Sequence, residues 1–343
     1  VYHRKRKNSR TTSFSSFFCL IFFLLSFGMT VVLCRAILPV LRKKHAGQYI
    51  LEIGPSWHLS KAGTPTMGGL SFLLPILLLS AGGAVYLWLT GERGTALSLL
   101  LIAFYGTLCG GIGCLDDLAK LRHRQNAGLS AAQKYFLQLL ASAVFLVAAE
   151  LLLHLGTAVH LPFSGRNLEL GFYYYPLALL FLTGLMNACN LTDGIDGLLS
   201  SVVLVIACFL FLLGARAGNS VLPLSGALLA GAAFGFLLWN AHPAKIFMGD
   251  TGSLFFGGLL AAGGIVSGEA VLLLIFAIMP VFETASVILQ VAFFRLTHGK
   301  RLFKMAPFHH HLEKCGLSEE EVVGIFSLVT LLACSLGVIF WKG

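Results

Sequence analysis

Charged side chains are scarce in this chain of 343 residues. Only 11% of the residues are Asp, Glu, Lys or Arg, whereas 57% are hydrophobic, and the mean hydropathy is +0.85. Soluble domains carry about 25% charged residues, so the composition excludes an ordinary soluble fold. The chain is therefore predicted to cross a membrane several times.

Closely spaced cysteine pairs are also missing. The eight cysteines are dispersed without any CxxC spacing, and most of them fall inside apolar runs. This pattern is typical of small buried hydrophobic side chains and argues against a zinc or redox motif. The net charge of +9 comes from Lys and Arg residues that flank the apolar runs. It indicates membrane topology and contact with anionic lipid, not a nucleic-acid partner.

Ten apolar runs are long enough to cross about 30 Å of hydrocarbon as helices. The expected fold is an all-α polytopic membrane protein with about ten transmembrane helices. A basic tail at 1–13 precedes a single integral-membrane domain at 14–343. The eighth run is short for a span. The runs cover residues 14–41, 67–89, 96–115, 135–155, 173–189, 198–213, 221–239, 253–266, 270–294 and 322–341.

The internal loops form two sets with unequal charge. One set holds fourteen Lys and Arg residues, whereas the opposite set holds only Arg93, Arg166 and Arg216. The positive-inside rule places the first set in the cytoplasm. The basic segment HRKRKNSR near the N-terminus would lie outside in this scheme and so opposes it. However, the fourteen cationic residues of the loops outnumber the five in this segment. The first set comprises residues 42–66, 116–134, 190–197, 240–252 and 295–321.

One loop of the opposite set has a pattern of its own. Between the fourth and fifth runs, short apolar alternation surrounds Gly165, Arg166 and Asn167. Alternation of this kind with a central glycine predicts a small hairpin, here on the outer face.

Aspartate is scarcer than any other charged residue type, and its placement is informative. The chain has five: Asp116 and Asp117 in GCLDDLAK, Asp193 and Asp196 in NLTDGIDG, and Asp250 in IFMGDTGS. All three motifs lie at the mouths of spans, on the loops assigned to the cytoplasm. Surface solubility would scatter acidic residues, whereas a site for a metal ion and phosphate groups would gather them.

The first and third of these motifs occur at span ends. Asp116 and Asp117 are predicted to end the third span, with side chains about 100° apart. One can then face a metal or phosphate while the other faces a membrane-bound substrate; a solvated helix end is the alternative. Asp250 begins the eighth span, where a hard oxygen ligand beside a helix N-terminus suits Mg²⁺ and phosphate together. A helix cap is the alternative for Asp250.

Two further sets of polar residues lie on the loops assigned to the cytoplasm. Asn190, Asp193 and Asp196 recur every third residue among glycines, which indicates a tight turn into the sixth span. They can bind Mg²⁺, sugar hydroxyls or a base edge, or can cap that span. In MAPFHHHLE, consecutive histidines diverge and no cysteine accompanies them, which favours contact with phosphate or a leaving group over a metal site.

Five sequence blocks occur in order over roughly residues 55–320: KAGTPTMGG, LDD, NLTDGIDGL, NAHPAKIFMGDTGS and APFHHHLE. Together they resemble the phospho-N-acetylmuramoyl-pentapeptide-transferase family, within the polyprenyl-phosphate N-acetylhexosamine-1-phosphate transferase superfamily. The resemblance implies transfer of phospho-MurNAc-pentapeptide from UDP-MurNAc-pentapeptide to undecaprenyl phosphate. The products would be lipid I and UMP, in the first membrane step of peptidoglycan synthesis.

The same resemblance implies a setting and a cofactor. The protein would lie in the bacterial cytoplasmic (inner) membrane, use Mg²⁺ at an active site on the cytoplasmic face, and form a homodimer. Direct attack by the lipid phosphate, with Asp116 or Asp117 removing its proton, is favoured over a covalent intermediate on an aspartate, although the sequence leaves both routes open.

Roles for individual residues also follow from the resemblance. Asp250 is the implied Mg²⁺ ligand, and Asp116, Asp117 and His309 join it as catalytic residues. Phe247 is the implied stacking face for uracil. The implied substrate-binding residues are Lys61, Thr66, Asn190, Asp193, Asp196, Asn240, Phe247, Gln290, His310 and His311.

Two alternatives remain open at the level of sequence. An N-acetylglucosamine-1-phosphate transferase of the same superfamily would share most blocks, but TPTMGG and HHHLE favour the muramoyl-pentapeptide enzyme. A secondary transporter also combines glycine-rich helices with intramembrane acids. Its ionisable residues are expected near the bilayer midplane, whereas here they gather at one mouth.

Overall fold

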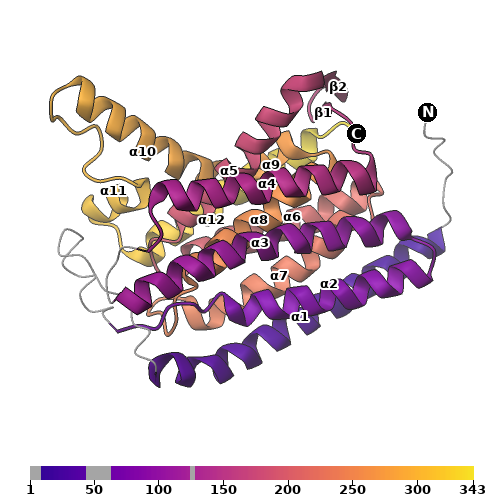
Figure 1. Ribbon diagram of the computed structural model, residues 1–343, viewed down its shortest axis with the longest axis horizontal. Coiled ribbons are helices and arrows are strands. Elements are labelled where there is room, and N and C mark those ends of the chain that lie inside the picture. Colours follow the sequence, from indigo (N-terminus) through magenta and orange to yellow (C-terminus); the bar gives the residue numbers. More distant parts are fainter. Residues whose placement is uncertain (1–8, 44–62, 124–127) are drawn as a thin grey trace.

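A computed structural model describes residues 9–43, 63–123 and 128–343. Within these residues, ten helices are long and apolar enough to cross a membrane, which confirms the predicted all-α polytopic fold. Most of them run side by side along one direction (Figure 1). The first six are α1 (Ser9–Lys43), α2 (Leu70–Leu89), α3 (Arg93–His123), α4 (Ala131–Leu153), α5 (Tyr174–Thr192) and α6 (Leu198–Ala217). The remaining four are α7 (Val221–Asn240), α8 (Gly249–Ser267), α10 (Ile278–Leu296) and α12 (Glu319–Phe340).

Three short helices and a hairpin complete the described fold. They are the 3₁₀ helix η2 (Gly171–Tyr173), α9 (Ala270–Phe276), α11 (Phe308–Lys314), and the antiparallel strands β1 (Ala158–Leu161) and β2 (Arg166–Glu169). The hairpin was predicted from its alternation and is confirmed. It lies at the opposite end of the bundle from α11 (Figure 1).

Several predicted helix boundaries were wrong. Helix α1 begins at Ser9, so part of the segment assigned to the tail is helical. Helix α8 begins at Gly249 and is a full span, because its polar first turn joins the helix. Helix α3 continues to His123, about two turns beyond Asp116 and Asp117. These two residues therefore lie within a helix and not at its C-terminal end, so the helix dipole does not oppose them there.

The ninth predicted span, at 270–294, is two helices instead of one. Helix α9 ends at Phe276, and α10 begins at Ile278. Pro280 has no backbone N–H and cannot donate to the carbonyl of Phe276, four residues before it. The Cys334 thiol approaches that carbonyl at 3.9 Å instead. Beyond the break, α10 slants away from the other long helices (Figure 1).

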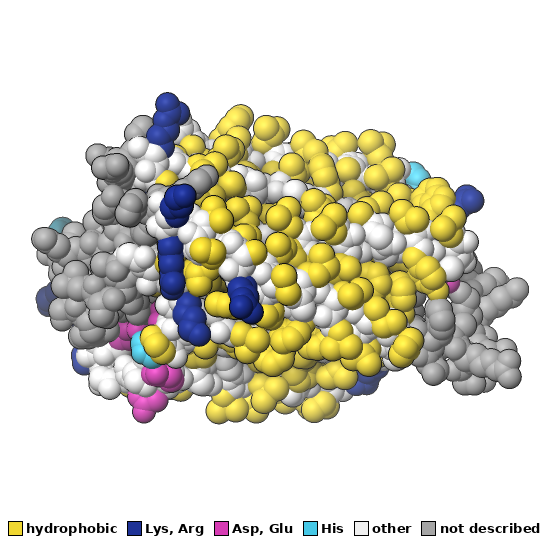
Figure 2. All heavy atoms as spheres, turned by 90° about the horizontal axis from the view of Figure 1, so that it is seen from below, with side chains coloured by type: hydrophobic (Ala, Val, Ile, Leu, Met, Phe, Trp, Pro, Cys, Tyr) yellow, Lys and Arg dark blue, Asp and Glu magenta, His cyan; other side chains and the backbone are white. Residues whose placement is uncertain are grey.

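Surface composition separates one end of the bundle from its middle. Figure 2 shows a broad hydrophobic surface with most of the visible Lys and Arg side chains gathered at one end. The C-terminal ends of α3, α5, α7 and α10 and the N-terminal ends of α8 and α12 meet at that end, because consecutive spans alternate in direction. The same end carries all three aspartate motifs.

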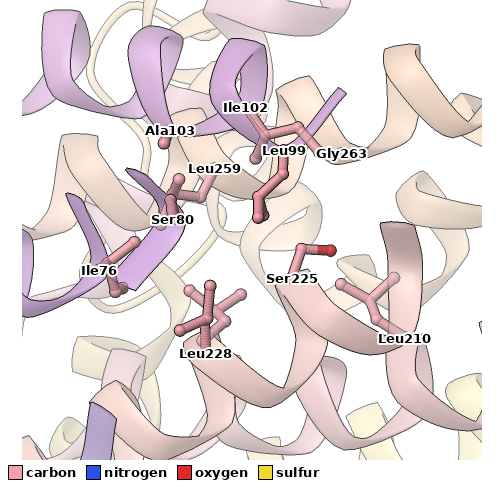
Figure 3. A pocket seen from close by; sticks show the side chains of 11 residues that line it. Ile76, Ser80, Leu99, Ile102, Ala103, Leu210, Ser225, Leu228, Leu259 and Gly263 are labelled. Atoms are coloured by element: carbon pink, nitrogen blue, oxygen red, sulfur yellow. The ribbon is translucent and has the colours of Figure 1, made fainter. Parts of the chain in front are cut away.

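A small cavity lies inside the bundle among α2, α3, α6, α7 and α8 (Figure 3). Its volume is about 20 Å³, and its lining is apolar apart from Ser80 and Ser225. Gly263 of α8 contributes to the lining, and a Cβ atom at this position would meet no atom within 4 Å. The cavity therefore has room for an added methyl group.

We expect Gly263→Ala to stabilise the protein by roughly 0.5–1 kcal/mol, since alanine costs less backbone entropy than glycine inside a helix. Thermal unfolding of the detergent-solubilised protein measures the effect. Gly257→Ala in the same helix is the matched control, because its Cβ would lie 2.7 Å from the Cα of Met186 and should destabilise. An unfolding temperature for Gly263→Ala at or below that of the parent protein would contradict the expectation.

Candidate active site

Three of the five aspartates converge at the basic end of the bundle. Asp116 and Asp117 come from α3, and Asp250 comes from the first turn of α8. One carboxylate oxygen from each lies within 4.8 Å of the others. Asp116 and Asp117 are buried, whereas Asp250 is half-buried. Side chains of adjacent helical residues point about 100° apart, yet the carboxylates of Asp116 and Asp117 reach the same centre.

Asp117 holds the start of α8 in place. Its carboxylate accepts hydrogen bonds from the backbone N–H groups of Asp250 at 3.2 Å and Thr251 at 2.9 Å, and from the Thr251 hydroxyl at 2.7 Å. The N-cap residue Met248 makes no side-chain capping bond. Asp117 thus caps α8 from a neighbouring helix, and a negative charge there is favoured by the helix dipole. The Asp250 side chain remains free of the capping role.

Two lysines lie against the carboxylates. The Lys120 Nζ atom is 2.6 Å from Asp116 and 3.1 Å from Asp250, and the Lys134 Nζ atom is 2.5 Å from Asp250. From the sequence, both lysines indicated only membrane topology, and their place in the site was not predicted. The i, i+4 spacing of Asp116 and Lys120 was a signal for the first lysine, but nothing local points to the second.

Asn190 joins this centre from the end of α5. Its side-chain N–H donates to Asp250 at 3.0 Å and to the Ser253 hydroxyl at 2.8 Å, while its amide oxygen lies 3.5 Å from Lys134. Asn190 thereby orients the Asp250 carboxylate from the end of α5.

Asp193 and Asp196 lie in the tight turn between α5 and α6, as the glycines of this motif predicted. Asp193 follows the last residue of α5. Desolvation and then the negative charges of Asp250 and Asp117 raise the pKa of Asp193 well above its usual range. Asp196 is buried, and its Oδ2 atom accepts from the backbone N–H of Ala244 at 2.9 Å. Neither residue caps α6, whose N-cap is Gly197 with a positive φ of 74°.

Asn240 and Phe247 shape the loop between α7 and α8. The Asn240 oxygen accepts from Gly197 N–H and the Ser200 hydroxyl, and its amide group donates to the Ile246 carbonyl. The half-buried Phe247 pairs through its backbone with the carbonyl of Pro65 and the N–H of Gly68. Asn240 is therefore engaged by its neighbours, whereas the aromatic face of Phe247 is partly accessible.

Thr66 lies beside the aspartate centre, whereas the position of Lys61 falls outside the described residues. A Cβ atom built on Gly249 would lie 2.7 Å from the Thr66 hydroxyl and 2.5 Å from the Asp117 carboxylate. Gly249 has a positive φ of 69°, so its backbone conformation and the missing side chain both allow this close approach.

The three histidines have three different surroundings. Glu283 is buried in α10 and accepts hydrogen bonds from the backbone N–H groups of Phe308 and His309, so it anchors α11. The buried His309 ring lies 3.3 Å from Glu283 and packs against Gly194. His310 pairs with Glu313 at 2.7 Å. Glu283 is a further residue that the sequence analysis did not single out.

His311 and Gln290 support the segment before α11. The Nδ1 atom of His311 accepts from the backbone N–H of Lys304 at 3.1 Å. The Gln290 oxygen accepts from the N–H groups of Leu302 and Phe303, and its amide donates to the Phe303 carbonyl. Both side chains thus hold a connecting segment in place.

The donor set of the centre suits a hard divalent cation. Asp116, Asp117 and Asp250 offer carboxylate oxygens within one ion's reach, and the Asn190 amide lies beside them. Mg²⁺ prefers oxygen ligands and is usually held by one or two carboxylates together with substrate phosphates. The residues present therefore fit a Mg²⁺ ion shared with a phosphate-bearing substrate.

Comparisons with known proteins identify the family of the chain. Residues 99–268 match glycosyl transferase family 4, and residues 61–73 match phospho-N-acetylmuramoyl-pentapeptide-transferase signature 1. The phospho-N-acetylmuramoyl-pentapeptide-transferase of Clostridium botulinum (strain Eklund 17B) is 43% identical over 316 residues, 92% of this chain and 94% of that protein. That of Clostridium perfringens (strain SM101) is 41% identical over 310 residues, 90% of this chain and 93% of that protein. The chain therefore belongs to the phospho-N-acetylmuramoyl-pentapeptide-transferase family.

Proposed function

We propose that this protein transfers phospho-MurNAc-pentapeptide from UDP-MurNAc-pentapeptide to undecaprenyl phosphate, with release of UMP and formation of lipid I. The observation that carries the proposal is the convergence of Asp116, Asp117 and Asp250 at one end of the helical bundle. A water-borne nucleotide and a membrane-bound acceptor can meet only at such an end. Membership of the family supports the identity of both substrates.

The protein's own groups supply positioning and charge neutralisation, which dominate phosphoryl transfer. Lys120 and Lys134 pair with Asp250. When a diphosphate enters, its oxygens pair with these two ammonium groups in place of Asp250. The Asp250 carboxylate is then available to hold Mg²⁺. Asp250, with Asp116 and Asp117 beside it, would hold a Mg²⁺ ion, which would supply positive charge against the diphosphate and the departing UMP.

Removal of the proton from the lipid phosphate falls to Asp116 in this proposal. The Asp117 carboxylate is held by three donors from α8. Asp116 accepts one backbone N–H, from Leu129, and pairs with Lys120. Because Asp116 is less committed to holding the fold, its carboxylate is better placed to accept a proton as the lipid phosphate attacks the donor directly.

The nucleotide-sugar pocket extends from this centre over the neighbouring loops. Phe247 offers its partly accessible ring to the uracil base, and His309 faces the Asp193 turn through Gly194. Asn240 and Gln290 support the walls of the pocket, because their side-chain amides are hydrogen-bonded within the protein. The other residues assigned to substrate binding are Lys61, Thr66, Asn190, Asp193, Asp196, His310 and His311.

The orientation in the membrane follows from charge. The loops at the active end carry fourteen Lys and Arg residues against three in the opposite internal loops, so this end faces the cytoplasm by the positive-inside rule. We infer a multi-pass protein of the bacterial cytoplasmic membrane, with one membrane domain over residues 14–343 and a homodimeric assembly.

Release of UMP from UDP-MurNAc-pentapeptide tests the proposal directly. The purified protein is expected to release UMP only when undecaprenyl phosphate and Mg²⁺ are both present. Chelation by EDTA should reduce the release to background, and added Mg²⁺ should restore it. UDP-GlcNAc as the donor is the control for the related sugar-phosphate transferases. Turnover of UDP-GlcNAc alone, or undiminished turnover after chelation, would refute the proposed reaction.

A further inference from the structure

A second group of metal-ligating side chains lies outside the aspartate centre. Asp196 comes from the turn between α5 and α6, His242 from the loop after α7, and Glu319 from the first turn of α12. One ligand atom from each lies within 4.8 Å of the others. We propose that these three side chains form a binding site for a transition-metal dication of the Zn²⁺ class.

The separations within this group suit tetrahedral coordination. The His242 Nδ1 atom is 3.0 Å from the Asp196 Oδ2 atom and 3.8 Å from the Glu319 Oε2 atom. Nitrogen and oxygen ligands at about 2.0–2.1 Å from a tetrahedral Zn²⁺ ion are about 3.4 Å from one another. The two observed separations lie on either side of this value, and the ligand atoms of Asp196 and Glu319 lie within 4.8 Å of each other.

Neighbouring backbone N–H groups already orient two of the three ligands. The Asp196 Oδ2 atom accepts the N–H of Ala244 at 2.9 Å, and the Glu319 Oε2 atom accepts the N–H of Asp196 at 3.0 Å. On the far side of the imidazole ring, the His242 Nε2 atom lies 3.8 Å from the Glu320 carboxylate. A carboxylate behind a ligating histidine fixes the ring and raises its basicity in protein metal sites. Asp196 and Glu319 are therefore positioned before an ion enters, and Glu320 lies near enough to the ring to close to a hydrogen bond once the ion is bound.

The chemistry of the two clusters differs. The aspartate centre offers only oxygen ligands and has two lysines against it, which suits Mg²⁺ together with phosphate. The second cluster includes an imidazole nitrogen, which favours Zn²⁺ and related ions over Mg²⁺. The His242 side chain is 36% exposed, whereas Asp196 and Glu319 are buried. An ion can reach the histidine from solvent and then engage the two carboxylates beneath it.

Binding at this cluster would tie three segments together. The ion would join the turn before α6, the loop after α7 and the start of α12. Asp196 is also a residue of the nucleotide-sugar pocket in the proposed function, and on that proposal a bound ion would compete with the donor. The site itself stands without the proposed function, because its ligands are defined by geometry alone.

Zinc binding is measured on the full-length protein, stripped of metals by chelation and then saturated with Mg²⁺. Isothermal titration with ZnCl₂, with bound zinc counted by elemental analysis, should show a site that His242→Ala weakens at least 10-fold. Glu320→Gln should weaken it about 10-fold, as loss of an outer carboxylate does elsewhere. Since Glu320 is exposed, this second variant should retain the fold even if the first does not.

His298→Ala is the matched control, because it removes an exposed histidine from the loop after α10. Unchanged zinc affinity in both cluster variants would overturn the proposal, as would an equal loss in the control. Zinc should also raise the apparent KM for the nucleotide sugar in the parent protein but not in His242→Ala. If zinc binds at His242 and the KM for the nucleotide sugar stays unchanged, the proposed competition between zinc and the nucleotide sugar is refuted. Absence of turnover with any donor would refute the proposed function and leave the binding result standing.

Discussion

Replacement of Asp250 by asparagine is expected to lower the rate of UMP release at least about 1000-fold, or about 4 kcal/mol of transition-state stabilisation. Lys120 and Lys134 form ion pairs with the Asp250 carboxylate, and Asn190 donates a hydrogen bond to it. Asparagine keeps the shape and one oxygen but removes the negative charge that Mg²⁺ requires. Steady-state UMP release at rising Mg²⁺ concentrations measures the loss, and high Mg²⁺ should recover only part of it.

The helical bundle should survive this substitution. The start of α8 is held by the Asp117 carboxylate through backbone N–H groups, which Asp250→Asn does not remove. Helical circular dichroism and the unfolding temperature should therefore stay close to those of the parent protein. Glu169→Gln, on the exposed β2 strand at the other end of the bundle, is the control for loss of one acidic charge. Near-normal Mg²⁺-dependent turnover by Asp250→Asn would remove Asp250 from the metal site.

Hydropathy was sufficient to predict ten spans and their order but not where the helices end. The run GCLDDLAKLRH is too polar to count as membrane-spanning, yet its backbone continues the hydrogen bonding of α3 to His123. The length of an apolar run indicates which residues cross the hydrocarbon, but a helix can continue beyond the hydrocarbon. Conversely, the apolar run at 270–294 is unbroken in hydropathy, while Pro280 interrupts its hydrogen bonding.

The sequence indicated which aspartates gather at the candidate site but not which residues pair with them. The confinement of aspartate to three motifs indicated one centre, and Asp116, Asp117 and Asp250 do meet. The glycines that follow Asn190 predicted a tight turn before the sixth span, and the structure has this turn. Helix α5 ends at Thr192, between the two residues, so Asn190 faces Asp250 while Asp196 faces His242. Lys134 and Glu283 act across helices, and no local pattern in a single sequence encodes such contacts.

A glycine close to the site controls how near α3 can approach α8. Gly113 is buried in α3, one turn before Asp117, and α3 and α8 form the most extensive helix pairing in the described structure. A Cβ atom at Gly113 would overlap the Asp250 carbonyl oxygen and lie 2.6 Å from the Thr251 backbone nitrogen. These are backbone atoms, so no side-chain rotation relieves the overlap. Close helix contact at small residues is a common means of association in membranes.

Gly113→Ala should therefore force the two helices apart and separate Asp116 and Asp117 from Asp250. A displacement of about 1 Å at a catalytic centre can cost about 100-fold in rate, and we expect a loss of that size in UMP release. Overpacking should also lower the stability by about 1–3 kcal/mol. The affinity for Mg²⁺, followed by calorimetry, should weaken together with the rate, because the three carboxylates no longer share one ion's reach.

Gly111→Ala provides the matched control, since it makes the same change two residues earlier in the same helix. Gly111 is exposed, and a Cβ atom there would meet nothing within 4 Å, so this variant should keep the activity and Mg²⁺ affinity of the parent protein. A loss confined to Gly113→Ala would attribute the effect to the α3–α8 approach and not to alanine in α3. Equal activity in the two variants would mean that the carboxylates hold their geometry without this contact. In that case, Asp117 alone would have to fix α8 against α3 through its three hydrogen bonds.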